Sequence, residues 1–298
     1  MIEAVVVGRV GIDLYPNELR TPLREVRTYT RYVGGFAGNV ATGLARLGVS
    51  TAIVSRVGDD GHGEFVRDFL EHEGIDTRLL SVDREWLTPP TFCEIWPPDD
   101  FPITFYRHPT APDWQIVVDE ADVDSVAAAP VLFATGTGLA QSPSRETTLA
   151  LVSEHRGTTV FDLDWRPSLW DDPMAFRPAV QEASGFADVV VGNTDEIAAA
   201  GGVDELLALA PAVVLKRGGA GAALYADGEV VDVPGIPVEV VNGLGAGDAF
   251  AAALGYAIVR GLGLREGIRL GNAAGAHVAQ RVACSEAMPT LDELTVAA

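Results

Sequence analysis

The chain has 298 residues, of which 48% are hydrophobic, so it is long enough to bury one large core or two smaller ones. Its formal net charge of −21 argues against nucleic acid or an anionic membrane as a partner, because binding to phosphate requires basic side chains. Two cysteines are too few for a disulfide framework, and the sequence shows neither a signal-peptide pattern nor a membrane-length apolar run, so we expect a cytoplasmic protein.

The first predicted element is a buried strand at residues 4–8, and Asp13 follows it closely. Ligands of open α/β sheets bind beyond the carboxyl ends of the strands, which makes Asp13 a candidate ligand-binding residue. Aspartate is also common in turns for local reasons, so Asp13 by itself leaves both interpretations open. Residues 14–33 are polar and irregular, with strand character near their end, and do not resemble part of a core.

A glycine turn at Gly34 and Gly35 leads into a predicted helix of small residues that ends at Gly48. Glycines let a polyol approach main-chain amides, and the side chain of Asn39 offers a donor and an acceptor to hydroxyl groups. Close packing between helices explains the same small residues, and the sequence alone supports both interpretations.

Alternating runs at residues 91–96 and 103–108 flank a turn-rich segment, which predicts a β-hairpin. The alternation places Phe105 and Arg107 on one face of the hairpin and Tyr106 on the other. A two-stranded element is rarely stable alone, so the hairpin should cover something. That can be a bound ligand, the same surface of a second chain, or both.

From residue 130 onward, predicted strands alternate with helices, which is typical of a parallel sheet. Several of these strands end in polar or glycine residues, where a doubly wound sheet builds its binding site. The predicted strands lie at 131–135, 159–163, 189–192 and 212–215. We therefore predict a single α/β domain over residues 1–298: a doubly wound, mostly parallel sheet flanked by helices, with a small β-strand lid formed by segments of about 14–33 and 88–108.

A predicted strand at 238–241 and a predicted helix at 249–259 enclose a turn with three glycines and, at its end, Asp248. Such a turn can direct several backbone N–H groups at one point, and the helix N-terminus there favours the negative charge of a phosphate. Asp248 would stand beside that phosphate, where it can take a proton from an attacking hydroxyl group. The alternative is that Asp248 only caps the helix.

Together these motifs resemble the PfkB, or ribokinase-like, family of sugar kinases over essentially the whole chain. The first family signature is similar to Gly34-Gly35 with Asn39, the second to Gly245-Ala246-Gly247-Asp248, and the N-x-x-E element to Asn193-Thr194-Asp195-Glu196. A closer similarity, to the 5-dehydro-2-deoxygluconokinase branch of the family, lies in segments 8–16, 91–102 and 242–248. The resemblance implies an enzyme that uses ATP and Mg²⁺ to phosphorylate the terminal hydroxyl of a keto-deoxy sugar acid such as 5-dehydro-2-deoxygluconate, in inositol catabolism.

The resemblance also implies a role for each matched residue. The implied catalytic residues are Asp248 as the general base and Gly245, Ala246 and Gly247 as an anion hole. The implied sugar-binding residues are Asp13, Gly34, Gly35 and Asn39 for the hydroxyl groups, and Arg107 and Arg166 for the carboxylate. The implied nucleotide-binding residues are Asn193, Lys216, Gly218, Gly221, Asn272 and Gly275, and Glu196 is expected to hold Mg²⁺ through water.

Other functions fit part of the pattern. The sugar acid 2-keto-3-deoxygluconate has a similar terminal hydroxyl, whereas fructose or ribose would leave two arginines without a carboxylate to bind. A non-catalytic sugar or nucleotide sensor is disfavoured because Asp248 and Glu196 are retained. Many members of the wider family have Asp-Thr where this chain has Asn242-Gly243, and the lost charge argues against K⁺ activation. The aromatic lid is also compatible with a homodimer.

Overall fold

A buried sheet forms the centre of the computed structural model, which describes residues 1–297. Within these residues the sheet has nine strands in the order β13-β12-β11-β10-β9-β8-β1-β4-β5. All neighbouring strands pair in parallel except β11 with β12 and β12 with β13, so the predicted doubly wound, mostly parallel sheet is confirmed. The strands are β1 (Ala4–Val7), β4 (Thr51–Gly58), β5 (Leu80–Asp83), β8 (Val131–Thr135), β9 (Thr158–Asp162), β10 (Val189–Asn193), β11 (Ala212–Lys216), β12 (Ala222–Ala226) and β13 (Glu229–Val233).

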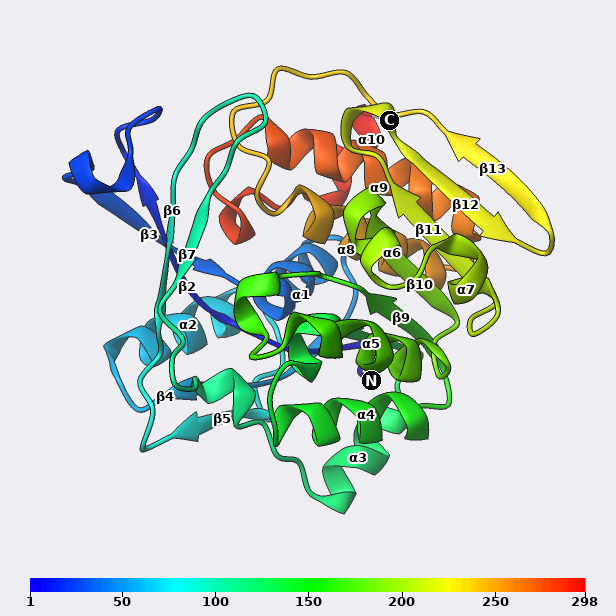
Figure 1. The fold of residues 1–298 in the computed structure, drawn as a ribbon, viewed down its shortest axis with the longest axis horizontal. Coiled ribbons are helices and arrows are strands. Elements are labelled where there is room, and N and C mark those ends of the chain that lie inside the picture. Colours follow the sequence, from blue (N-terminus) through cyan, green and yellow to red (C-terminus); the bar gives the residue numbers. More distant parts are fainter. Residues whose placement is uncertain (298) are drawn as a thin grey trace.

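Helices cover both faces of this sheet (Figure 1). Successive side chains of a strand point to opposite faces, so in β1 Val6 joins one hydrophobic cluster while Val5 and Val7 join the other. The first face is covered by α1 (Phe36–Arg46), α2 (Gly61–His72), α8 (Ala246–Val259) and α9 (Leu264–Ala279), with α10 (Leu291–Ala297) against α9. The second face is covered by α3 (Glu120–Ala127), α4 (Ser144–Glu154), α5 (Phe176–Ser184), α6 (Thr194–Ala199) and α7 (Val203–Leu207). Short 3₁₀ helices are η1 (Leu23–Glu25), η2 (Pro112–Trp114), η3 (Gly136–Leu139), η4 (Pro167–Leu169), η5 (Pro173–Ala175), η6 (Gly218–Ala220) and η7 (Ser285–Ala287).

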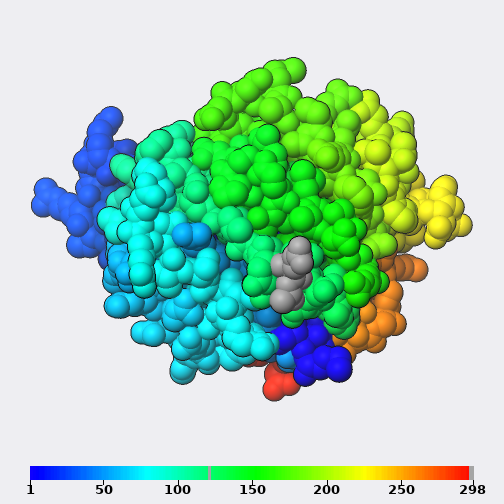
Figure 2. All heavy atoms as spheres, turned by 90° about the horizontal axis from the view of Figure 1, so that it is seen from below, coloured from blue at the N-terminus to red at the C-terminus, as the bar shows by residue number. Residues whose placement is uncertain are grey.

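A second, four-stranded sheet stands beside the helical body at the left of Figure 1, and we call it the lid. Its strands, in the order β3-β2-β6-β7, are β2 (Gly11–Pro16), β3 (Tyr29–Gly34), β6 (Pro90–Cys93) and β7 (Ile103–Phe105). Viewed from below, the connection between β2 and β3 projects from one side of the molecule and the β12–β13 turn from the opposite side (Figure 2). The lid is thus built from two separate parts of the chain that meet where β2 pairs with β6.

Residues 238–241 do not form the strand that their alternating valines predict. Alternation suits any extended segment with one apolar face, and here Val238 and Val240 line a pocket instead of joining a sheet. The N–H groups of Val241 and Asn242 donate to the carbonyl oxygen of Ala279, at the end of α9, over 2.8 and 3.1 Å. Hydrogen bonds to a helix end therefore replace those of a strand partner.

Two residues of the lid lie in surroundings that the sequence alone did not indicate. Asp13 lies in the middle of strand β2 and pairs with Tyr32 of β3, so it is not in a turn. Tyr15 is only 1% exposed, although its surroundings in the sequence do not resemble a core. It packs in a small apolar cluster with Cys93 and Cys284, which are distant in the sequence.

Within residues 1–297, no helix combines the length and the apolar character needed to cross a lipid bilayer.

Candidate active site

The turn before helix α8 brings Gly245 and Asp248 to the wall of one pocket. The N-cap residue of α8 is Gly245, whose φ of 81° lies in the left-handed region that glycine tolerates best. A Cβ atom at Gly245 would also lie 2.8 Å from Cys284 Sγ, so the position excludes larger residues. Asp248 lies in the first turn of the helix, and its Oδ2 accepts a hydrogen bond from Asn39 Nδ2 at 2.6 Å. The simple capping interpretation of Asp248 therefore does not hold.

The environment of Asp248 favours its protonated form. Burial raises the pKa of Asp248 to about 7, against an ordinary value of 3.8. The hydrogen bond from Asn39 and the charge of Lys216 lower this pKa, whereas the nearby carboxylates of Asp162 and Asp164 raise it. A carboxylate that titrates near neutral pH can exchange a proton with a ligand under physiological conditions.

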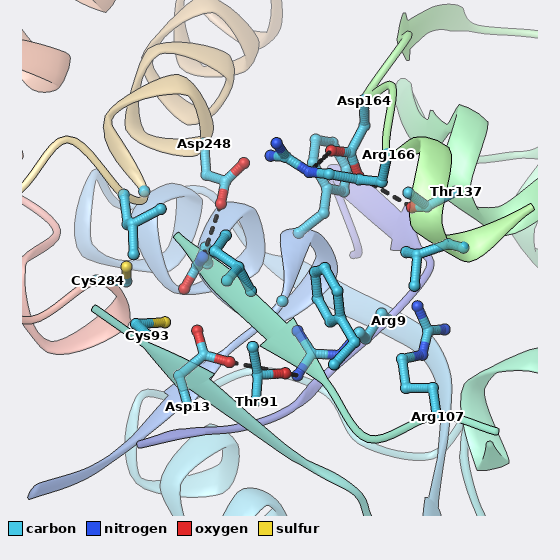
Figure 3. Close-up of a pocket in the computed structure, with 18 of the residues that line it drawn as sticks. Arg9, Asp13, Thr91, Cys93, Arg107, Thr137, Asp164, Arg166, Asp248 and Cys284 are labelled. Carbon is cyan, nitrogen blue, oxygen red and sulfur yellow. Dashed lines mark hydrogen bonds and ion pairs between the residues drawn. The ribbon is translucent and has the colours of Figure 1, made fainter. Parts of the chain in front are cut away.

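A pocket lies between the lid and the first turn of α8, and we call it the lid pocket (Figure 3). Asp13 enters it from β2, and the backbone of β3 passes so close that a Cβ atom at Gly34 would lie 2.0 Å from Asp13 Oδ2. Arg9 Nη2 connects the two neighbouring lid strands, because it donates to Asp13 Oδ1 at 3.3 Å and to Thr91 Oγ1 at 2.6 Å. The absent side chain of Gly34 thus makes room for a carboxylate that faces the pocket.

Three guanidinium groups line the lid pocket, and each has a carboxylate partner. Arg9 pairs with Asp13, Arg166 Nε lies 3.1 Å from Asp164 Oδ1, and Arg107 Nη2 pairs with Asp113. Arg107 is 2% exposed, and burial lowers its pKa to about 10, so it still carries its charge at neutral pH.

The guanidinium of Arg107 lies against an aromatic ring, with its carbon 3.7 Å from the centroid of the Trp114 ring. Its Nε and Nη1 atoms are buried without a hydrogen-bond partner among the described residues. Buried donors are normally paired, so the N–H groups on these two nitrogens are available to a ligand in the lid pocket.

A second pocket, which we call the glycine pocket, lies on the other side of the same turn. Gly243, Ala246 and Gly247 line the glycine pocket, whereas Gly245 and Asp248 line the lid pocket. The rest of the glycine pocket is lined by the end of β11, by η6 and the residue after it, by the segment after β13 and by α9. The residues are Lys216, Gly218, Gly219, Gly221, Gly235, Ile236, Gly271, Asn272 and Gly275. The turn at the start of α8 therefore separates two pockets and contacts both.

Lys216, the only lysine in the chain, stands at this boundary. Its Nζ donates to Asp162 Oδ2 at 2.8 Å and would lie 3.5 Å from a Cβ atom at Gly247. Although burial disfavours its charge, the carboxylates of Asp162 and Glu196 raise the pKa of Lys216 well above its ordinary value. A permanent cation thus lies beside the N-terminus of a helix, and both features attract phosphate.

Asn193 and Glu196 form a capping box at the start of α6. Asn193 Oδ1 accepts the N–H groups of residues 195 and 196, and Glu196 Oε2 accepts the N–H of Asn193 at 2.7 Å. Burial raises the pKa of Glu196, and Lys216 opposes that rise. Residues 1–297 contain no group of three or more His, Cys, Asp or Glu side chains arranged to hold a metal ion.

Residues 1–291 match the model of the family described as pfkB family carbohydrate kinase. The chain belongs to this family. It is a phosphotransferase with a sugar hydroxyl group as acceptor.

A 5-dehydro-2-deoxygluconokinase of Shouchella clausii is 37% identical to this pfkB family member, over 98% of this chain and 94% of the relative. An enzyme of the same name from Bacillus subtilis is 34% identical, over 98% and 94% of the two chains. Among solved structures, a fructokinase of Vibrio cholerae with fructose, ADP and a calcium ion has a TM-score of 0.86 at 25% identity, and covers 99% of this chain and 98% of its own. A double mutant of that fructokinase was solved with fructose, ADP and a potassium ion.

In this pfkB family member most of the sequence-predicted site residues lie on one of the two pockets. The lid pocket is lined by Asp13, Gly35, Asn39, Arg107, Arg166, Gly245 and Asp248, with Gly34 directly behind Asp13. The glycine pocket is lined by Lys216, Gly218, Gly221, Ala246, Gly247, Asn272 and Gly275. Asn193 and Glu196 line neither pocket, although Glu196 is near enough to Lys216 to influence its pKa.

Sequence reasoning missed several residues of the lid pocket: Arg9, Thr91, Thr137 and Asp164. Asp164 connects two of the walls, because its Oδ2 accepts a hydrogen bond from Thr137 Oγ1 at 2.9 Å while Oδ1 pairs with Arg166. It also adopts a φ of 37°, which is unusual for a residue other than glycine. Its position two residues before Arg166, at the end of a predicted strand, was the available signal.

Proposed function

We propose that this pfkB kinase transfers the γ-phosphoryl group of ATP to the terminal hydroxyl of 5-dehydro-2-deoxygluconate. This substrate is taken from the name of the relatives, 5-dehydro-2-deoxygluconokinase, which are 33–37% identical over 98–99% of the chain. The observation that carries the proposal is the lid pocket, which combines Asp248 with the guanidinium groups of Arg9, Arg107 and Arg166. A neutral sugar needs no such cations, whereas a carboxylate binds them through charge-assisted hydrogen bonds.

The proposed mechanism places the sugar in the lid pocket and ATP in the glycine pocket. Asp248 takes the proton of the terminal hydroxyl while the oxygen of that group forms a bond to the γ-phosphorus. The bond between this phosphorus and the bridging oxygen breaks, and ADP leaves. Backbone N–H groups of 245–247 at the start of α8 neutralise the charge on the transferring group, and Lys216 adds a cation from the side of the glycine pocket.

The proposed cofactor is Mg²⁺, which Glu196 would help to hold through a water molecule beside the nucleotide phosphates. When bound, the ion supplies further neutralisation of the phosphate charge. We propose that Asn193 supports this function through the capping box that fixes the carboxylate of Glu196. The adenine would lie beside Asn272 and Gly275 of α9, where the small side chains leave space for a flat ring.

Two broader features complete the proposal. The chain would act as a single ribokinase-like domain over residues 1–298, with the two lid segments inserted, and would work in the cytoplasm. We also propose a homodimer through the outer face of the lid, where aromatic side chains gather.

A comparison of acceptors tests the proposed substrate. The purified enzyme is assayed with ATP and 5-dehydro-2-deoxygluconate, 2-keto-3-deoxygluconate, fructose or ribose, and kcat/KM is compared. We expect the first compound to have the highest kcat/KM, and to be preferred over fructose and ribose by at least about tenfold, since these neutral sugars lack a carboxylate and one well-placed charged hydrogen bond contributes roughly 1.5–3 kcal/mol. A preference for 2-keto-3-deoxygluconate or for a neutral sugar would replace the proposed substrate.

The role of Arg107 is tested separately with the same acceptors. Arg107→Ala should raise KM for the sugar acid by about tenfold or more and leave KM for a neutral ketose nearly unchanged. The matched control is Arg67→Ala, because Arg67 of α2 is part-buried and lies outside both pockets. Equal effects of Arg107→Ala on both acceptors would show that Arg107 does not bind the carboxylate.

A further inference from the structure

The loop formed by residues 282–286 lies directly beneath the turn that precedes α8. Val282 accepts a hydrogen bond from Asn242 Nδ2 at 2.7 Å through its carbonyl oxygen. Cys284 fills the space that a side chain at Gly245 would need. Figure 3 shows Cys284 close to Asp248 on the same side of the lid pocket. This loop is therefore in a position to affect the geometry of the candidate general base.

The next residue of the loop, Ser285, begins a chain of two hydrogen bonds that ends at this base. Ser285 Oγ lies 2.6 Å from Asn39 Oδ1, and Asn39 Nδ2 lies 2.6 Å from Asp248 Oδ2. Ser285 is 0% exposed and Asn39 is 3% exposed, so water does not compete for these groups. The three side chains come from η7, α1 and α8, which are far apart in the sequence.

The direction of each hydrogen bond follows from the chemistry of the ends. An ionised carboxylate accepts hydrogen bonds and donates none, so the amide nitrogen of Asn39 must face Asp248. The amide oxygen of Asn39 then faces Ser285, and the hydroxyl of Ser285 must donate to it. Ser285 thus pairs the amide oxygen of Asn39 and stabilises the orientation that the carboxylate requires. It also leaves the Oδ1 atom of Asp248 available to the substrate.

We propose that Ser285 is a positioning residue for phosphoryl transfer: it holds the amide of Asn39 in the orientation that fixes Oδ2 of Asp248 and directs Oδ1 toward the acceptor hydroxyl. This inference rests on the proposed role of Asp248 as general base. Ser285 contacts neither pocket and acts through Asn39 alone.

Loss of the Ser285 hydroxyl should change the protonation of Asp248. Without that donor the amide oxygen of Asn39 is buried and unpaired, so the native orientation of the amide loses stabilisation. The flipped amide, whose oxygen faces the carboxylate, then becomes more populated. Two facing oxygens repel each other unless one carries a proton, so Asp248 would bind its proton more tightly. The charged and titratable groups around Asp248 are Asp162, Asp164, Arg166, Lys216 and Cys284, and all of them remain in a Ser285 variant.

The test compares the pH profile of kcat in wild type and Ser285→Ala with saturating ATP and sugar. We expect the acid limb of the profile to move up by about one pH unit, because the Asn39 hydrogen bond lowers the pKa of Asp248. At pH 7 kcat should fall by about fivefold, because the ionised fraction of Asp248 drops from about one half to about one tenth, and most of this loss should be recovered at pH 9. KM for ATP should change less than about twofold. An acid limb at the wild-type position would overturn the proposal.

Two further variants separate positioning from a general loss of structure. Ser285→Thr keeps the hydroxyl and should retain the wild-type acid limb. Ser184→Ala is the matched control, because Ser184 of α5 is also 0% exposed and its Oγ donates to Val180 at 2.6 Å, remote from both pockets. It should leave the profile unchanged, and a shift equal to that of Ser285→Ala would contradict the proposal.

A double-mutant cycle tests whether Ser285 acts through Asn39. If it does, Ser285→Ala combined with Asn39→Ala loses no more activity than Asn39→Ala alone, whereas independent effects would multiply. Multiplied effects would overturn the inference. These comparisons use whichever acceptor the wild type phosphorylates, so a wrong sugar-acid assignment would leave this test intact, and failure here would leave the substrate assignment intact.

Discussion

At the scale of single residues, the pKa of Asp248 makes the reaction pH-dependent. Burial raises this pKa to about 7, and the general base works only in its ionised form, so kcat should rise with pH through about 7 and level off above it. Asp248→Asn cannot take the proton and should lower kcat by ~10²–10⁴-fold while ATP affinity stays similar. Steady-state kinetics and calorimetric ATP titration measure both effects. An unchanged kcat would remove Asp248 from the role of base.

The same residue links activity to stability. Because the pKa of Asp248 is raised on folding, the folded state binds the proton more tightly than the unfolded state between its ordinary value of 3.8 and about 7. The contribution of Asp248 to stability is therefore best below pH 3.8 and is lost as pH rises through 7. Asp248→Asn should raise Tm by at least about 2 °C at pH 8 and by less at pH 5. An equal change at both pH values would contradict the raised pKa.

Sequence reasoning located the residues that belong to local motifs, but not those that depend on long-range contacts. Asp248 was predicted from a glycine turn and a helix start within a few residues. Arg9 contacts Thr91, which is 82 residues away, and Ser285 contacts Asn39, which is 246 residues away. No spacing in a single sequence indicates such pairs. The folded chain alone brings them together.

At the scale of elements, the turn before α8 is held by the side-chain amide of Asn242. Asn242 is 0% exposed, its Nδ2 donates to the carbonyl oxygen of Val282, and its Oδ1 accepts the N–H of Leu244 at 3.0 Å. A monovalent cation bound there would need oxygen ligands free of such donors. We therefore expect wild-type activity to be the same in KCl and NaCl at fixed ionic strength.

The substitution Asn242→Asp restores the carboxylate and removes the donor. It should lower activity in NaCl and make the rate rise several-fold in KCl, because a cation would then offset the buried charge. Asn17→Asp, at an exposed position in the lid, is the matched control and should respond to neither salt. Strong activation of the wild type by K⁺ would contradict the expectation that the Asn242 amide leaves no place for a monovalent cation at this turn.

The lid hairpin contributes to both pockets. Ile103 lines the lid pocket, and Pro98 and Asp99 of the same hairpin line the glycine pocket. Between them, the ring of Phe101 lies over the turn before α8, where a Cβ atom at Gly243 would come within 2.9 Å of it. One element of the lid therefore touches the sites proposed for sugar and nucleotide.

Loss of the Phe101 ring should weaken the binding of both substrates, the sugar and ATP. Phe101→Ala should raise KM for sugar and for ATP by about tenfold each, since a truncated aromatic ring forfeits a few kcal/mol of packing. Leu87→Ala is a suitable control, because Leu87 is 70% exposed and lies outside both pockets. An effect on the sugar alone would confine the hairpin to the lid pocket.

At the scale of the whole molecule, the fold was predictable because alternating strands and helices and a two-sided core follow from local patterns. The valines of residues 238–241 misled the prediction, since an extended segment packed on α9 has the same apolar pattern as a strand. The lid was harder to predict from the sequence, because its sheet joins two distant parts of the chain. Tyr15 of this sheet is buried against Cys93 and Cys284, which are far from it in the sequence.

The outer face of the lid carries an aromatic row that a second molecule could cover. The ring centroids of Tyr29 and Phe92 are 5.3 Å apart and those of Phe92 and Tyr106 are 5.4 Å apart, and Tyr106 is 58% exposed. Phe105 points the opposite way, into the lid pocket, so its packing belongs to the ligand site. Tyr29 and Phe92 are half-buried, and a partly exposed aromatic row of this kind is compatible with an interface.

We expect the wild type to sediment as a dimer at micromolar concentration and Tyr106→Arg to sediment as a monomer, because opposed arginines at the centre of a symmetric interface repel each other. Met174→Arg is the matched control, since Met174 is 81% exposed and lies in η5, far along the chain from the lid. It should remain dimeric. If the dimer supports closure of the lid, the monomeric Tyr106→Arg variant should also show a raised KM for the sugar. A wild type that sediments as a monomer would refute the proposed interface.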